Sequence, residues 1–229
     1  LCFPLATASN AMTSVEAGYD LFQTQPGTSM NTGLLTPPLP LGTILFEGVP
    51  LETFDFGGTT GVQSTGNADT IVERKTPATV STTPGSDTID IEIVALQLKS
   101  VSPVDLTPLD PSFGLPSSAE LFITLQTRRL PGEADPGAPS NANKGEMTIN
   151  FADENGGTFS SFFDLFFDIR LNAVDGGIIF SADKRFETAG TEWNRLPEPG
   201  DILIDGVNHF LLGLNDPTGD FFPEPLTEF

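Results

Sequence analysis

The sequence has very few of the residues that most catalytic and metal sites use. It contains one cysteine, Cys2, and one histidine, His209, among 229 residues. A single cysteine excludes an intramolecular disulfide, although a chain of this length buries enough surface without one. A single histidine makes a transition-metal site of ordinary nitrogen and sulfur ligands hard to build. Because the sequence also lacks a Gly-x-Ser-x-Gly motif, a phosphate-binding loop and a dinucleotide fingerprint, we expect a non-catalytic protein.

Basic residues are scarce as well. Ten Lys and Arg stand against 31 Asp and Glu, which gives a formal net charge of −21 at pH 7. Nucleic acids and anionic membrane surfaces require a basic face, so the composition excludes both as general partners. Charged residues are 18% and hydrophobic residues 38% of the chain, which differs from the composition of a solvated disordered tail. No apolar run approaches the roughly 20 residues of a membrane-spanning helix, and no span is expected.

Glycine and proline are abundant, and apolar residues alternate with polar ones. The 23 Gly and 20 Pro favour many turns over long helices. Ile89, Ile91 and Ile93 alternate with polar residues, and a shift of phase at Val94-Ala95 indicates a β-bulge. Other expected strands are 44–46, 53–56, 70–72, 121–125, 147–151, 178–180, 202–204 and 210–212. We predict an all-β protein, a β-sandwich or jelly roll of about nine or ten strands with Pro/Gly-rich loops. The proline-rich segment 130–139 is the best candidate for an exposed loop.

The segment 159–171 fits two kinds of structure. A helical spacing relates its five phenylalanines, Phe159, Phe162, Phe163, Phe166 and Phe167. A strand instead places Leu165 and Ile169 on the same face as three of these rings, and leaves the opposite face to Ser160, Asp164, Asp168 and Arg170. We favour the strand, because a helix leaves Leu165 and Ile169 off its apolar stripe. In both cases the rings are expected in the core.

Both ends of the sequence are apolar. The first residues lead into Ala6-Thr7-Ala8, which is typical of the end of a secretory signal, and a short docking strand is the alternative. We treat residues 1–20 as an N-terminal segment of one of these kinds and residues 21–229 as a single β-sandwich domain. Apolar ends can dock on a neighbouring subunit or on their own chain. The candidate interface residues are Phe3, Leu5, Phe221, Phe222 and Phe229.

Two loops combine carboxylate, amide and glycine residues, the composition that supplies oxygen ligands to calcium. The candidate metal ligands are Asp153 and Asn155 in the first loop and Asn215, Asp216 and Asp220 in the second. Neither loop follows the EF-hand pattern, and Asx turns are the alternative for both. Ca²⁺ is therefore the one cofactor that the sequence suggests.

Four blocks between residues 50 and 170 resemble exported bacterial all-β proteins of the kind often sorted by a Pro-Glu-Pro (PEP-CTERM) signal. The blocks are Phe54 to Gly58, Asp69 to Arg74, Ile91 to Leu96 and Gly157 to Ile169. Pro223-Glu224-Pro225 is similar to the sorting triplet, although the apolar span and basic cluster of the full signal do not follow it. The resemblance implies export and a secreted or cell-surface setting, and it implies no particular activity.

These observations favour a non-catalytic extracellular structural protein. We expect a self-assembling subunit of a filament, sheath or matrix, in which terminal strand addition joins the copies into a homo-oligomer or filament. The first alternative is a secreted carbohydrate-binding β-sandwich module, calcium-dependent or not, in which exposed aromatic residues stack on sugar rings. The presence of only one Trp, Trp193, and one Tyr, Tyr19, counts against it. The second is a glycoside hydrolase with two carboxylates, for which Asp90 and Glu92 are the nearest local pair.

Overall fold

The described part of the chain is built from strands. The computed structural model describes residues 12–58, 60–109, 111–135, 137–196 and 221–223, which contain short 3₁₀ helices but no α-helix. The prediction of an all-β protein is confirmed. Within these ranges, no helix has the length and apolar character needed to cross a bilayer. The strands expected at 202–204 and 210–212 lie outside the described residues.

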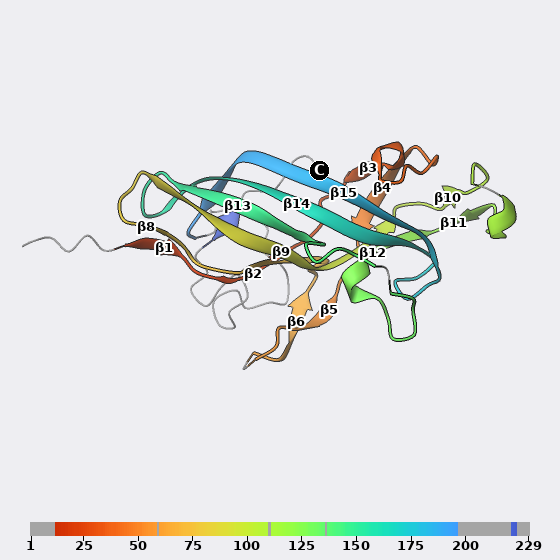
Figure 1. The fold of residues 1–229 in the computed structure, drawn as a ribbon, viewed down its shortest axis with the longest axis horizontal. Coiled ribbons are helices and arrows are strands. Elements are labelled where there is room, and N and C mark those ends of the chain that lie inside the picture. Colours follow the sequence, from red (N-terminus) through yellow and green to blue (C-terminus); the bar gives the residue numbers. More distant parts are fainter. Residues whose placement is uncertain (1–11, 59, 110, 136, 197–220, 224–229) are drawn as a thin grey trace, which may run out of the picture.

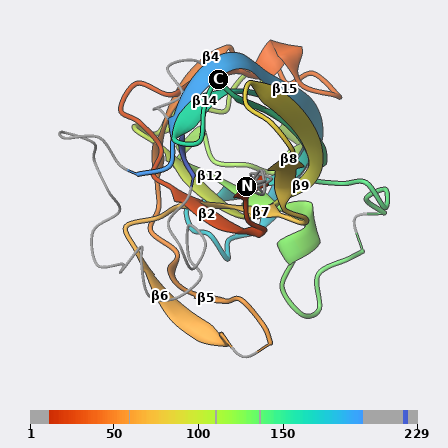
Figure 2. The same cartoon turned by 90° about the vertical axis from the view of Figure 1, so that its left-hand side faces the viewer.

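Ten strands form the main sheet, and two of them organise the rest. They are β2 (Gly18–Phe22), β3 (Ser29–Asn31), β4 (Thr43–Gly48), β7 (Thr70–Arg74), β9 (Gly85–Ser100), β12 (Leu121–Leu125), β13 (Lys144–Phe151), β14 (Gly156–Leu171), β15 (Ile178–Asn194) and β16 (Phe222–Pro223). β12 and β13 each pair with both β9 and β14, over different segments of these long strands. β12 lies beside residues 97–99 of β9 and β13 beside residues 85–92, so the two strands follow one another in the same gap between β9 and β14. The sheet curls around a common axis (Figure 2), and a bridge between Thr36 and Asp183 joins the segment after β3 to β15.

The expected β-sandwich or jelly roll is corrected by this topology. A sandwich has two separate sheets that face each other, whereas here a small closed barrel carries extra strands on one continuous sheet. β9 and β14 are 16 residues long, so each pairs with several partners, and the twist of long strands brings the sheet back on itself. Alternation does not distinguish the two folds, because both place every second residue inside.

Three two-stranded sheets lie outside the main one. They are β1 (Thr13–Val15) with β8 (Ala78–Val80), β5 (Glu52–Asp55) with β6 (Val62–Gly66), and β10 (Val104–Asp105) with β11 (Ser118–Ala119). The β5–β6 hairpin projects from the body, and β10 and β11 lie near one end of it (Figure 1). The 3₁₀ helices are η1 (Thr32–Leu34), η2 (Pro111–Phe113) and η3 (Gln126–Arg128).

Two local predictions are confirmed. β14 contains the segment 159–171 as a strand. The predicted bulge lies in β9, where Ile71 pairs with Ala95 but the next residue, Val72, pairs with Ile93, which leaves Val94 as the extra residue. The bulge places Ala95 in a small second cluster with Leu21 and Ile71, against which Val94 also packs, while Ile93 and Leu96 contact the main core.

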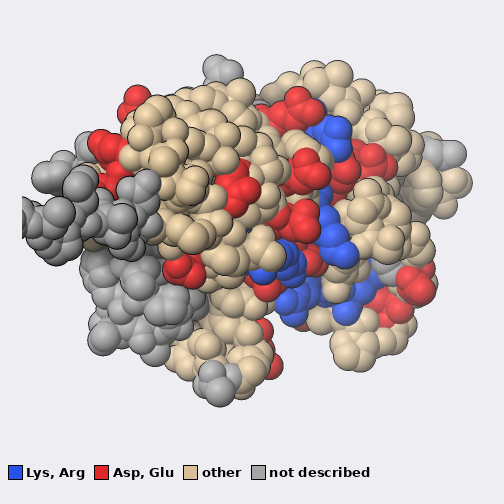
Figure 3. Space-filling view, turned by 60° about the vertical axis from the view of Figure 1, so that its left-hand side comes forward, with Lys and Arg blue, Asp and Glu red and all other residues tan. Residues whose placement is uncertain are grey.

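Ion pairs hold the loop between β12 and β13 against the outer face of β14. Arg129 Nη2 lies 2.7 Å from Asp168 Oδ1, and Arg170 Nη1 lies 2.6 Å from Glu133 Oε1. Hydrogen bonds from Arg170 lower the pKa of Glu133 from 4.5 to about 2. Asp168 and Arg170, expected on a half-exposed face, are therefore buried. More widely, Lys and Arg gather on one face of the protein with Asp and Glu between them (Figure 3).

Candidate functional site

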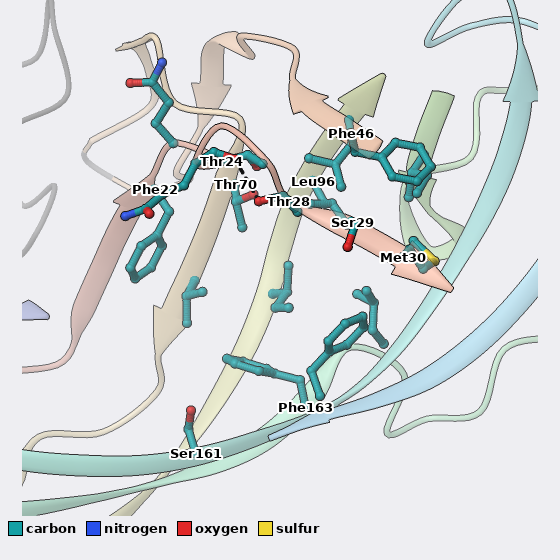
Figure 4. Close-up of a pocket in the computed structure, with 18 of the residues that line it drawn as sticks. Phe22, Thr24, Thr28, Ser29, Met30, Phe46, Thr70, Leu96, Ser161 and Phe163 are labelled. Carbon is teal, nitrogen blue, oxygen red and sulfur yellow. Dashed lines mark hydrogen bonds between the residues drawn. The ribbon is translucent and has the colours of Figure 1, made fainter. Parts of the chain in front are cut away.

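The interior of the curled sheet contains a cavity of about 190 Å³. Every strand of the main sheet except β16 supplies at least one lining residue. Phenylalanine rings form much of the wall: Phe22, Phe46, Phe159, Phe163, Phe186 and Phe221. Figure 4 shows Phe22, Met30, Phe46 and Phe163 around this space. The cavity is thus a product of barrel closure, and it is mainly apolar.

The polar lining residues are all uncharged. Gln23, Gln25 and Ser29 are the exposed members of the lining, so the connection from β2 to β3 forms the entrance. Thr24 and Thr28 lie beside them, and Ser161 lies on the opposite wall, on β14 (Figure 4). The lining contains no Asp, Glu, Lys or Arg, in a protein whose net charge is −21.

A buried carboxylate anchors the entrance. Asp69 is 0% exposed. Its Oδ2 accepts a hydrogen bond from the Thr24 backbone N–H at 2.6 Å, and its Oδ1 accepts from the hydroxyls of Thr24 at 2.9 Å and Thr70 at 2.7 Å. Burial raises the pKa of Asp69 above its ordinary 3.8, and these hydrogen bonds offset part of that rise. A Cβ at Gly48 would lie 1.7 Å from Asp69 Oδ2, so glycine leaves the space that the carboxylate needs.

Asp69→Asn is expected to change how stability depends on pH. The pKa of Asp69 is raised in the folded state, so this group stabilises the fold below the unfolded pKa and loses that contribution as pH rises through the folded pKa. Asn does not titrate, so the variant lacks this loss. The free energy of unfolding of the variant, relative to that of the unmodified protein, should therefore increase as pH rises from 4 to 7. Urea unfolding across this range measures the difference.

Asp105→Asn is the matched control, with the opposite sign. The backbone N–H and hydroxyl of Thr107 lower the pKa of this exposed carboxylate. Its contribution is present above the unfolded pKa and lost as pH falls through the folded pKa, below 3.8. The relative stability of the Asp105→Asn variant should therefore change below about pH 4 and stay nearly constant from pH 4 to 7. A constant difference between Asp69→Asn and the unmodified protein across the range would show that the Asp69 prediction is wrong.

Aromatic and charged residues close the cavity at Phe221. This ring is 1% exposed and stacks on Trp193, with 5.3 Å between centroids and an interplanar angle of 26°. The Arg74 guanidinium carbon lies 5.2 Å from the Phe221 centroid. Arg74 in turn pairs with Asp20, with 2.9 Å between Nε and Oδ2. Phe221 therefore separates the apolar cavity from a buried ion pair.

The candidate calcium ligands lie away from this cavity or outside the described residues. Asp153 and Asn155 are exposed, and Asp153 Oδ1 accepts a hydrogen bond from the Asn155 backbone N–H at 2.7 Å, which is an Asx turn. Within the described ranges, no three His, Cys, Asp or Glu side chains are grouped so that they could hold a metal. The other candidates lie outside the described residues: Asn215, Asp216 and Asp220.

Of the candidate interface residues, some lie within the described residues and the others lie outside them. Phe3, Leu5 and Phe229 lie outside the described residues. Phe221 is buried in the core of its own chain, which is the docking alternative that the sequence left open. Phe222 belongs to β16, where it pairs with Asn194 at the end of β15. A segment late in the sequence thus adds to the β15 edge within one chain.

The residues considered for sugar binding or hydrolysis either pack against other side chains, form an ion pair or face away from the cavity. Trp193 is 0% exposed, so its indole is not available to stack on a sugar. Tyr19 is half-buried, with its ring edge-on to Phe56 at 4.9 Å. Glu92 forms an ion pair with Lys75 at 2.7 Å. Asp90 and Glu92 alternate with core residues of β9 and so face away from the cavity.

Sequence reasoning did not find the cavity, because its lining is scattered from Phe22 to Phe221 and no local pattern joins these residues. The nearest signal was the aromatic block in 159–171, which was expected in the core. Comparison with known proteins adds no further identification, since no protein-family model, curated protein or solved structure matches this chain.

Proposed function

We propose that this protein binds a small apolar molecule in the cavity of its curled sheet. The observation that carries the proposal is the cavity itself, about 190 Å³ in volume and lined by aromatic and aliphatic side chains from nearly every strand of the sheet. An engineered apolar cavity of about 150 Å³ takes up benzene. A single-ring molecule with a short substituent therefore matches the available volume.

The energetics of packing support this proposal. Protein interiors are close-packed, and a cavity costs about 24 cal/mol per Å³ in lost contacts. A ligand that fills the space restores those contacts. Binding at this site is consequently expected to stabilise the folded state as well as to hold the ligand.

Propylbenzene, a neutral single-ring probe, is expected to raise the melting temperature. At a free concentration of 100 times its Kd, a ligand adds about 2.7 kcal/mol to the free energy of unfolding. Val72→Phe should abolish this increase, because Val72 lines the cavity and a phenyl ring would occupy it. Thermal unfolding with and without propylbenzene measures the effect, and calorimetry gives the Kd.

Val62→Phe is the matched control, because the same substitution is made at a residue of the β5–β6 hairpin that is 64% exposed. This variant should bind propylbenzene as the unmodified protein does. Equal binding by the Val72→Phe and Val62→Phe variants, or no binding by the unmodified protein, would show that the cavity is not the binding site.

The other expectations stay predictions. Assembly into a filament, sheath or matrix is supported only by the way β16 adds to β15, which shows that this edge accepts a strand. A glycan-binding role would have to use surfaces other than Trp193. The resemblance to exported bacterial proteins adds a secreted or cell-surface setting, in which a barrel that binds a small apolar molecule would act as a carrier or a scavenger.

A further inference from the structure

The chemistry of the lining limits the kind of ligand. No charged side chain lines the cavity. Two bases lie next to lining rings without lining the cavity themselves: Arg74, over Phe221, and Lys184, whose Nζ is 5.9 Å from the Phe186 centroid. Arg74 already pairs with Asp20. A carboxylate in the cavity would therefore be desolvated without a counter-charge, which is strongly unfavourable.

Apart from the polar residues of the entrance and Thr70, whose hydroxyl donates to Asp69, one polar residue lines the cavity. Ser161 is 9% exposed and lines the wall opposite the entrance, with its hydroxyl directed into the space (Figure 4). Within the described ranges, the Ser161 hydroxyl has no hydrogen-bond partner. The Ser161 oxygen is not among the fully buried unpartnered atoms, so it is reachable from the cavity and can bind a group placed there. The neighbouring Ser160, by contrast, faces outward and accepts a hydrogen bond from the Gly190 backbone N–H at 3.2 Å.

From these two observations we infer that the ligand is an uncharged molecule with one hydroxyl or carbonyl group, which forms a hydrogen bond with the Ser161 hydroxyl. The inference rests on the proposed function and adds the ligand class to it. A hydroxyl both donates and accepts hydrogen bonds, so Ser161 suits an alcohol, a phenol or a ketone. The apolar remainder of the molecule contacts the phenylalanine rings. Simple fatty acids and other carboxylates are excluded as preferred ligands.

Three probes that share one apolar skeleton test the inference: propylbenzene, 4-propylphenol and 4-propylbenzoate. Calorimetry at pH 7 should show that 4-propylphenol binds at least as tightly as propylbenzene, and that 4-propylbenzoate binds at least 100-fold more weakly than 4-propylphenol. Ser161→Ala should weaken 4-propylphenol binding roughly three- to tenfold, the usual range for one net hydrogen bond. It should leave propylbenzene binding unchanged.

Ser160→Ala is the matched control, and it should leave the affinities for all three probes unchanged. The inference is overturned if 4-propylbenzoate binds as tightly as 4-propylphenol, and loss of that binding in a Lys184→Gln variant would identify Lys184 as the counter-charge. It is also overturned if Ser161→Ala leaves 4-propylphenol binding unchanged. Failure of all three probes to bind the unmodified protein would instead contradict the proposed function.

Discussion

Asp20→Ala is expected to lower the free energy of unfolding by about 3–5 kcal/mol, the usual effect of removing one partner from a buried ion pair. Asp20 and Arg74 are each 1% exposed, and the two side chains share two contacts, Nε to Oδ2 at 2.9 Å and Nη2 to Oδ1 at 3.2 Å. The substitution leaves the guanidinium buried without this carboxylate. Urea unfolding followed by circular dichroism measures the loss.

Two further variants make the Asp20 result specific. The double variant Asp20→Ala with Arg74→Met should lose much less stability than Asp20→Ala alone, because an apolar pair leaves no buried charge. Glu47→Ala removes the partner of Lys99 from a pair whose side chains are 50% and 30% exposed, and it should cost less than about 1 kcal/mol. If Asp20→Ala lowers the free energy of unfolding no more than Glu47→Ala does, Asp20 is not needed to neutralise a buried Arg74.

Phe221→Ala is expected to have an effect of similar size, about 3–5 kcal/mol, as for other large aromatic residues in protein cores. Phe221 stacks on Trp193, packs on Phe159 with 5.5 Å between ring centroids and lines the cavity. Trp193 is the single tryptophan of the chain, so its fluorescence should shift to longer wavelength when the stacked ring is removed. Unfolding in urea gives the change in stability.

Phe113→Ala is the matched control for this experiment. Phe113 is 64% exposed, and its loss should change stability by no more than about 0.5 kcal/mol.

The dependence of stability on protein concentration distinguishes docking of Phe221 on its own chain from docking on a second copy. If Phe221 docks in its own chain, the stability of the unmodified protein is independent of concentration, whereas docking on a second copy makes stability rise with concentration. Equal effects of Phe221→Ala and Phe113→Ala would contradict the core position of Phe221.

Local features of the strands were predictable because they depend on a period of two residues. The alternation of Ile89, Ile91 and Ile93 predicts their burial on one face of β9, and the shift at Val94-Ala95 predicts the bulge. The secondary structure of segment 159–171 is harder to predict, since its phenylalanines also have the spacing of a helix. The positions of Leu165 and Ile169 decided for a strand, and both are buried in β14.

Pairing over long sequence separations was not predictable. Asp20 and Arg74 are 54 residues apart, and nothing near either residue indicates the other. Asp168 and Arg170 follow the polar phase of β14, yet they are buried because Arg129 pairs with Asp168 and Glu133 pairs with Arg170. Glu133 belongs to the segment 130–139, whose described residues are mostly exposed, as expected. In both cases a charged residue is buried because a distant partner neutralises it, and composition does not contain that information.

The sequence alone thus determined the all-β class, the positions of about half of the described strands, the excess of acids and the lack of catalytic motifs, because composition and short periods carry these properties. Only the tertiary structure decided that the sheet curls into a barrel, that Trp193 and Phe221 are core residues, and that Ser161 faces a cavity. The physical reason is that the alternation of apolar and polar residues along a strand shows which side chains face inward. The pairing of β9 with β12, β13, β7 and β4 determines which other side chains these residues contact.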